Sequence, residues 1–142
     1  MASIVYTPSI NELELRFLTL LEMAFPKKRF EVCYSIGELS TRLGMPSSNI
    51  KVAVFFAVTR KEINRILPLY DLIADVKSIL VLSDLEEDKE TMMKAHLLRP
   101  RYVAWADCDL IDIVTVTKRM VDLYDAPQGE NDRRIRSADM KP

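Results

Sequence analysis

The sequence predicts a single α/β domain in which a parallel sheet of five strands is covered by five helices. Three observations predict this fold class. Short runs rich in β-branched and aromatic residues recur along the chain, and a helical pattern follows each run. The helix starts also share one capping signature. Strands alternating with helices favour a parallel sheet with right-handed crossovers.

The strand predictions are strongest in the middle of the chain. Residues 50–58 (IKVAVFFAV), 78–82 (SILVL) and 101–105 (RYVAW) are continuously apolar at their centres instead of alternating. That pattern is typical of strands buried on both faces, as in a parallel sheet between helices. Two weaker runs, 2–6 (ASIVY) and 29–34 (RFEVCY), precede them and complete the five strands.

Each run is followed by apolar residues at helical spacing, which predicts an amphipathic helix. The second helix is short and ends before Gly44, a residue type favoured at helix C-termini. Pro68 falls inside the third helix and should kink or shorten it. The five predicted helices span residues 10–25, 36–43, 60–76, 85–98 and 109–124.

A hydroxyl residue followed three positions later by glutamate marks most of these helix starts. In such a capping box the side chains bond the otherwise unpaired backbone N–H groups of the first turn. A looser version, Asp109-x-x-Asp112, precedes the last helix. The four full matches are Ser9-x-x-Glu12, Ser35-x-x-Glu38, Thr59-x-x-Glu62 and Ser83-x-x-Glu86.

Composition and charge narrow the classes of partner. The chain has 142 residues, a net charge of −1, and basic and acidic residues that are interspersed. This balance gives no electrostatic reason to expect nucleic acid or a membrane surface as a partner. No apolar stretch is long enough to span a bilayer, and no signal peptide is recognisable. We therefore expect a cytoplasmic protein.

Residues 1–125 form the predicted domain, and residues 126–142 are expected to be a flexible tail. The tail contains proline, glycine, asparagine and scattered charges without an apolar pattern. Its cluster Arg133, Arg134 and Arg136 would suit an acidic partner, although neighbouring acidic residues make a solvated chain end the simpler interpretation.

Five strand–helix units in about 125 residues resemble the CheY-like receiver domain of bacterial two-component signalling. The resemblance covers residues 3–125 and depends on the order and spacing of the elements. It implies a flavodoxin-like three-layer sandwich with strand order 2-1-3-4-5. It also implies a phosphorylation site at the carboxyl ends of the strands, where an acidic pair binds Mg²⁺ and an aspartate receives the phosphoryl group.

The residues at those positions depart from the family pattern. The first strand ends in Tyr6-Thr7-Pro8 without a carboxylate, and Phe56 stands where the phosphoacceptor aspartate is expected. The lysine after the fifth strand is absent. Ser83 alone matches, at the position of the hydroxyl that contacts the phosphate. We therefore expect an atypical receiver, or pseudo-receiver, that is not phosphorylated by the usual mechanism and is not an enzyme.

The sequence gives little support for a metal site, a reactive thiol or a phosphate-binding loop. His96 is the only histidine, and the two cysteines, Cys33 and Cys108, lack metal-type spacing, so free thiols are the expected state. The three glycines form no phosphate-binding loop. Acidic residues gather at 84–88 and at 107–109, where a cation could bind, but carboxylates also favour helix N-termini. We expect no cofactor and no metal.

The sequence therefore predicts a non-catalytic, receiver-like protein-interaction module in bacterial signal transduction, with self-association as a homodimer. The candidate surface lies on the fourth helix and fifth strand, because that region carries the output face in receivers. Its four residues are Met92, Met93, His96 and Trp105. The alternative is a small-ligand-binding α/β domain that uses the cleft at the strand ends.

Overall fold

A computed structural model of the chain describes residues 3–8, 11–26, 30–45, 49–83, 89–105 and 109–124. It contains one five-stranded sheet in the order β2-β1-β3-β4-β5, and every neighbouring pair is parallel. The predicted fold class, including the strand order, is confirmed. The strands are β1 (Ser3–Tyr6), β2 (Phe30–Cys33), β3 (Val52–Val58), β4 (Lys77–Leu82) and β5 (Tyr102–Trp105).

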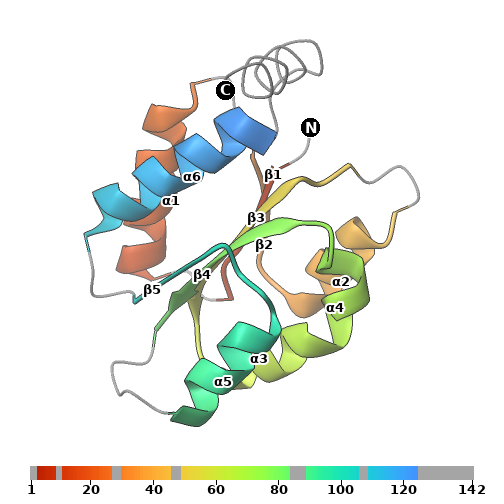
Figure 1. Ribbon diagram of the computed structural model, residues 1–142. Helices are drawn as coiled ribbons and strands as arrows, with labels where there is room; N and C mark the ends of the chain where they lie inside the picture. Colours follow the sequence, from red (N-terminus) through yellow and green to blue (C-terminus); the bar gives the residue numbers. More distant parts are fainter. Residues whose placement is uncertain are drawn as a thin grey trace, which may run out of the picture.

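Helices cover both faces of this sheet and give a three-layer molecule (Figure 1). On one face lie α1 (Glu12–Ala24) and α6 (Leu110–Tyr124), which pack side by side. The opposite face carries four shorter helices. They are α2 (Ile36–Leu43), α3 (Arg60–Ile66), α4 (Tyr70–Ile73) and α5 (Lys89–Leu97).

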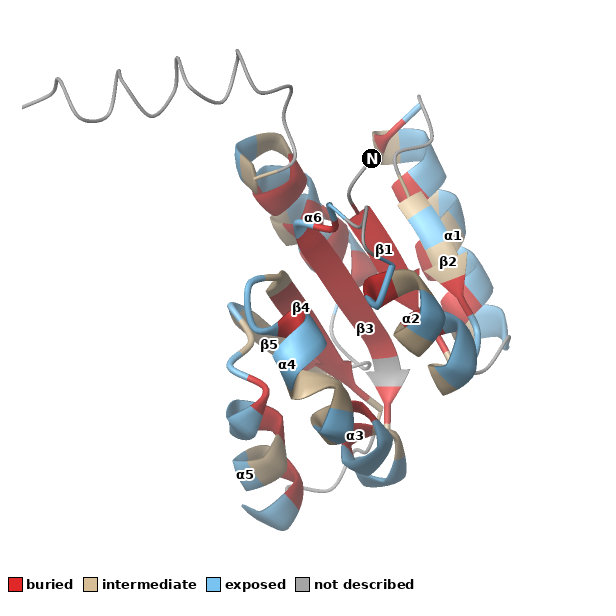
Figure 2. Ribbon diagram, turned by 90° about the vertical axis from the view of Figure 1, so that its right-hand side faces the viewer, coloured by how far each residue is buried: buried red, intermediate tan, exposed pale blue. Residues whose placement is uncertain are grey.

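The sheet separates two apolar clusters, and its central strands are buried on both sides (Figure 2). Successive side chains of a strand point to opposite faces, so the consecutive residues Phe55 and Phe56 enter different clusters. Phe55 meets Tyr6 edge to face, on the side of α2 to α5. Phe56 stacks on Phe17 of α1, on the side of α6.

Three of the predicted helix caps are present. The Ser35 and Thr59 hydroxyl oxygens accept hydrogen bonds from the backbone N–H groups of Glu38 and Glu62. The Asp109 carboxylate accepts one from the N–H of Ile111, at 2.9 Å. These side chains therefore satisfy donors at the starts of α2, α3 and α6. The predicted box Ser83-x-x-Glu86 reaches into residues 84–88, which lie outside the described residues.

The predicted cap of the first helix was wrong. The helix begins at Glu12, two residues later than the predicted start, and its cap is Asn11 instead of Ser9. The Asn11 side chain accepts hydrogen bonds from the N–H groups of Leu13 and Glu14, and the Glu14 carboxylate accepts one from the Asn11 N–H. Both Ser9 and Asn11 have a glutamate three positions later, so the capping-box pattern fits the sequence at two positions that are two residues apart.

Pro68 shortens the third predicted helix, as expected. The helix α3 ends at Ile66, a 3₁₀ turn η1 (Leu67–Leu69) contains the proline, and α4 continues for one turn. A proline inside a helix removes a backbone donor, and its ring clashes with the preceding turn. The 3₁₀ turn accommodates both effects.

The helix α5 ends at an unusual backbone position. Arg99 has a φ of 51°, and it is the only non-glycine residue of the described part of the chain with a positive φ. Its N–H donates to the carbonyl oxygen of His96 at 3.0 Å, which closes the last turn. A left-handed residue at this place is a common helix ending, although glycine usually occupies it.

Candidate functional site

The carboxyl edge of the sheet is the place where open α/β folds bind ligands, and here hydroxyl residues follow three of the strands. Thr7 follows β1, Thr59 follows β3 and Ser83 follows β4. Thr7 is buried, whereas the other two residues are half-buried. The Thr7 N–H donates to the carbonyl oxygen of Cys33 and the Ser83 N–H to that of Val58, both at 3.0 Å. Ser83 thus lies at the edge, where the sequence placed it.

A carboxylate from α3 lies beside one of these hydroxyl groups, that of Thr59. The Thr59 hydroxyl donates to Oε2 of Glu62 at 2.6 Å. This carboxylate is therefore held by a hydrogen bond within the first turn of α3. Burial, and then the negative charge of Glu62, raise the pKa of the Tyr6 phenol, while Arg65 acts in the opposite direction. The Tyr6 phenol therefore keeps its proton, and its ring packs in the apolar core cluster.

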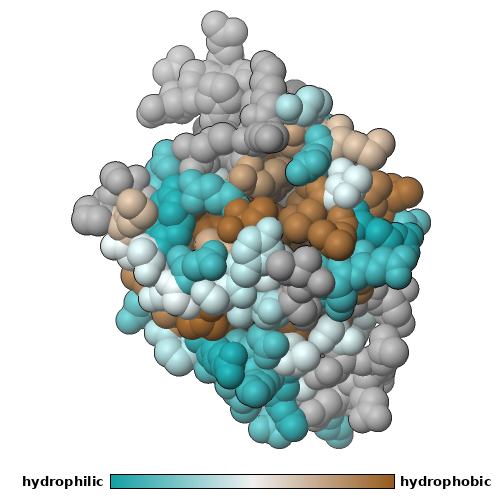
Figure 3. Space-filling model, turned by 180° about the vertical axis from the view of Figure 1, so that it is seen from behind, coloured by the Kyte–Doolittle hydropathy of each residue, from teal (hydrophilic) through white to brown (hydrophobic). Residues whose placement is uncertain are grey.

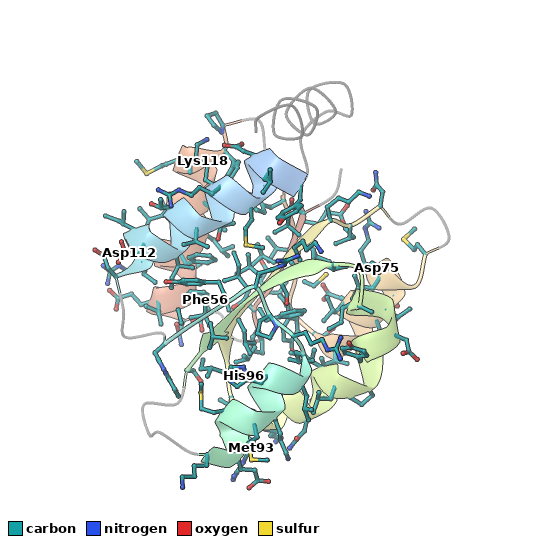
Figure 4. All side chains as sticks on the ribbon, viewed as in Figure 1. Phe56, Asp75, Met93, His96, Asp112 and Lys118 are labelled. Atoms are coloured by element: carbon teal, nitrogen blue, oxygen red, sulfur yellow. The ribbon has the colours of Figure 1, made fainter. Side chains whose placement is uncertain are left out.

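Phe56 is fully buried and has no access to this edge. Its ring stacks on that of Phe17, with the centroids 4.2 Å apart and the planes 7° from parallel. Figure 4 shows the residue between the sheet and the layer formed by α1 and α6. A phenyl ring offers neither an oxygen ligand to a hard cation nor a nucleophile to a phosphoryl group. The register between β3 and β4 also shifts between Phe55 and Val58.

Cys33 at the end of β2 is not a reactive thiol. The residue is 5% exposed. Burial, followed by the charges of Glu38 and Glu31, raises its pKa to about 11, and Arg42 lowers it in part. Because the thiolate is the nucleophilic form, the thiol is inert near neutral pH. Cys108 lies outside the described residues.

Within the described ranges, no three His, Cys, Asp or Glu side chains gather as a metal ion would require. The acidic residues Asp84, Glu86, Glu87, Asp88 and Asp107 lie outside those ranges. None of the helices in the described part of the chain has the length and apolar character that crossing a bilayer requires.

The predicted interaction surface divides into two pairs of residues. Met93 and His96 lie exposed on the outer side of α5 (Figure 4), and Met93 is 70% exposed. Met92 and Trp105 are half-buried and pack against the core cluster beneath the helix. Leu97 is 61% exposed and belongs with the outer pair. The i, i+4 spacing of Met93 and Leu97 is the signal that could have revealed it.

A shallow groove between β5 and α6 was not predicted from the sequence. It has a volume of about 250 Å³ and is mostly apolar, with two arginines at its border. Its residues come from parts of the chain that are distant in sequence, so no local pattern marks it. They are Arg101, Tyr102, Val116, Arg119, Met120, Leu123 and Tyr124.

No family model matches the sequence, and no curated protein matches it. Solved structures do. A CheY-like response regulator receiver domain protein from Methanospirillum hungatei is 13% identical, with a TM-score of 0.60 over 86% of this chain and 94% of that chain. A response regulator from Thermotoga maritima is 16% identical, with a TM-score of 0.55 over 86% and 98% of the two chains.

A further similar structure is a putative pilus assembly-related protein from Burkholderia pseudomallei. It is 18% identical, with a TM-score of 0.56 over 84% of this chain and 88% of that chain. At these identities the likeness concerns the fold. The chain therefore has the CheY-like receiver fold that these proteins share.

Proposed function

We propose that this chain, which has the CheY-like receiver fold, is a protein-interaction module of bacterial signal transduction that works in the cytoplasm without aspartyl phosphorylation. Receiver folds carry signals through surfaces that contact other proteins. In our proposal this chain binds other proteins as receivers do, but aspartyl phosphorylation does not control the binding. Self-association is part of it.

The observation that carries the proposal is the burial of Phe56. In a receiver the corresponding residue accepts a phosphoryl group and must be reached from solvent by the donor and Mg²⁺. Here an aromatic stack fills the space between β3 and α1. The neighbouring Thr59 hydroxyl is also engaged, since it donates to Glu62.

The outer side of α5 supports a role in binding. Met93 and Leu97 expose large apolar side chains beside the exposed His96. Methionine-rich surfaces adapt to different partners because the side chain is flexible and polarisable. Apolar residues that gather on a surface mark sites of protein contact. We assign the partner-binding surface to Met93, His96 and Leu97.

Treatment with acetyl phosphate and Mg²⁺ tests the missing chemistry. We expect the intact mass and the thermal unfolding midpoint to stay unchanged, while a phosphorylatable receiver in the same experiment gains one phosphoryl group. A labile mass increase of one phosphoryl group on this chain would refute the proposal, and a Ser83→Ala variant would then report whether that hydroxyl contacts the group.

Photo-crosslinking in cells tests the surface. A photoreactive residue at position 93 should give a discrete adduct with another protein, whereas one at Lys61, exposed on α3, should not. Equal adducts from both positions would contradict the assignment of the binding surface to α5.

A further inference from the structure

The edge strand β2 has a strand neighbour, β1, on one side only, and it lies at the opposite side of the described sheet from β5. The Cys33 carbonyl oxygen points toward β1, because it accepts a hydrogen bond from the N–H of Thr7, the residue that follows β1. The N–H and C=O of one strand residue point to the same side, and successive residues alternate. The backbone groups of Phe30, Val32 and Tyr34 therefore point away from β1.

The same three residues line a groove between β2 and α1. It has a volume of about 190 Å³ and is closed on the helix side by Leu18, Leu21, Glu22 and Phe25. Phe30 packs edge to face against Phe25, with the ring centroids 4.7 Å apart. Tyr34 remains 42% exposed at the end of the groove. Figure 3, which looks at this edge of the sheet, shows apolar atoms gathered across the middle of the face.

The strand is self-complementary about Val32. Its pattern is aromatic, Val32, aromatic, with Phe30 two residues before the valine and Tyr34 two residues after it. In an antiparallel pair centred on Val32, Phe30 of one copy lies opposite Tyr34 of the other. Directly opposite residues are the unit of sheet stabilisation, and aromatic pairs are among the favourable ones.

We propose that β2 of one molecule pairs antiparallel with β2 of a second copy around a two-fold axis at Val32, which joins the two sheets into one. The two valines exchange both of their backbone hydrogen bonds, as residues with outward-pointing groups do in antiparallel ladders. The Phe30 N–H donates to the Tyr34 carbonyl of the second copy. The Tyr34 N–H, which bonds Oε2 of Glu38 at 3.3 Å in the single copy, exchanges that oxygen for the Phe30 carbonyl of the second copy.

Charge complementarity supports this pairing. Antiparallel pairing brings the chain that precedes one β2 alongside the chain that follows the other. Lys27, Lys28 and Arg29 immediately precede Phe30 in the sequence, and the exposed Glu38 follows Tyr34. By sequence order alone, antiparallel pairing brings this basic segment of one copy toward the acidic residue of the other at both ends of the pair, which favours the antiparallel register over a parallel one.

A proline at position 32 tests the pairing with little harm to the monomer. The Val32 N–H does not belong to the β1 ladder, and proline is tolerated on edge strands where the N–H faces solvent. The full chain should sediment as a dimer at high micromolar concentration. Val32→Pro should sediment as a monomer and still unfold cooperatively. Val32→Thr, a β-branched control, and Met93→Lys, on α5, should remain dimers.

Hydrogen exchange of the wild-type Val32 amide provides a second measurement that needs no variant. The amide should exchange roughly ten times or more slowly in the concentrated sample than after dilution, because pairing protects it. Equal exchange at both concentrations, a monomeric wild type, or a dimer that survives Val32→Pro would overturn the pairing. So would dissociation of the dimer by Met93→Lys. The inference rests on the self-association in the proposed function and names its surface, and the phosphorylation experiment has no bearing on it, so the two can fail separately.

Discussion

Cys33 shows how burial at one position controls chemistry. Burial raises its pKa to about 11, whereas the unperturbed value is 9.0. In a Cys108→Ala background at neutral pH, a thiol reagent should react roughly tenfold or more slowly with the folded chain than with the denatured chain. Equal rates would show that the thiol is accessible in the native state.

The same shift makes stability depend on pH in alkaline solution. Between pH 9 and about 11 the folded thiol keeps its proton while the unfolded thiol has lost it. The folded state then binds more protons, so the free energy of unfolding falls as the pH rises through this window. Below pH 9 both states are protonated and this contribution does not vary. The free energy of unfolding can be measured by denaturant titration at a series of pH values. Plotted against pH, it should have a different slope in the wild type and in Cys33→Ala only within that window.

The start of α1 allows the two possible caps to be compared directly. Asn11→Ala removes the acceptor for the N–H groups of Leu13 and Glu14, and should lower the free energy of unfolding by about 1 kcal/mol. Ser9→Ala should change it by less than half as much. Urea unfolding of the two variants measures the difference. A larger loss from Ser9→Ala would place the cap two residues earlier.

The end of α5 offers a stabilising substitution. Arg99 adopts a φ of 51°, a conformation that a side chain disfavours and glycine does not. Arg99→Gly should raise the free energy of unfolding by about 1 kcal/mol. Arg99→Ala serves as the control and should bring no such gain, because alanine keeps the Cβ. A loss of stability in the glycine variant would mean that the arginine side chain stabilises the helix end.

Sequence patterns predicted the elements well and their surfaces poorly. Local rules placed the break at Pro68 and the caps at Ser35 and Thr59, because the groups involved are neighbours along the chain. The exposure of Leu97 depends on how α5 is rotated against the sheet, which is set by packing with distant residues. The grooves beside α1 and α6 arise from the meeting of helices with edge strands, and no local signal marks them.

At the scale of the whole molecule, the two edges of the sheet have different roles in our proposals. Pairing of β2 around a two-fold axis buries the same strand in both copies, so the assembly closes at two molecules. The exposed side of α5 then lies at the other end of each sheet and remains available to a partner. A dimer of this kind presents two equivalent partner sites.

The division of the core by the sheet has a consequence for how substitutions combine. Phe17 and Phe56 touch, whereas Phe17 and Phe55 lie in clusters on opposite faces. A double-mutant cycle with leucine at Phe17 and Phe56 should therefore give a coupling energy of about 0.5 kcal/mol or more, and the cycle with Phe55 should be additive within about 0.5 kcal/mol. The effect of a substitution beside α1 and α6 should then depend on other residues of that layer and little on those of the opposite layer, which allows the two halves of the interior to diverge separately in evolution.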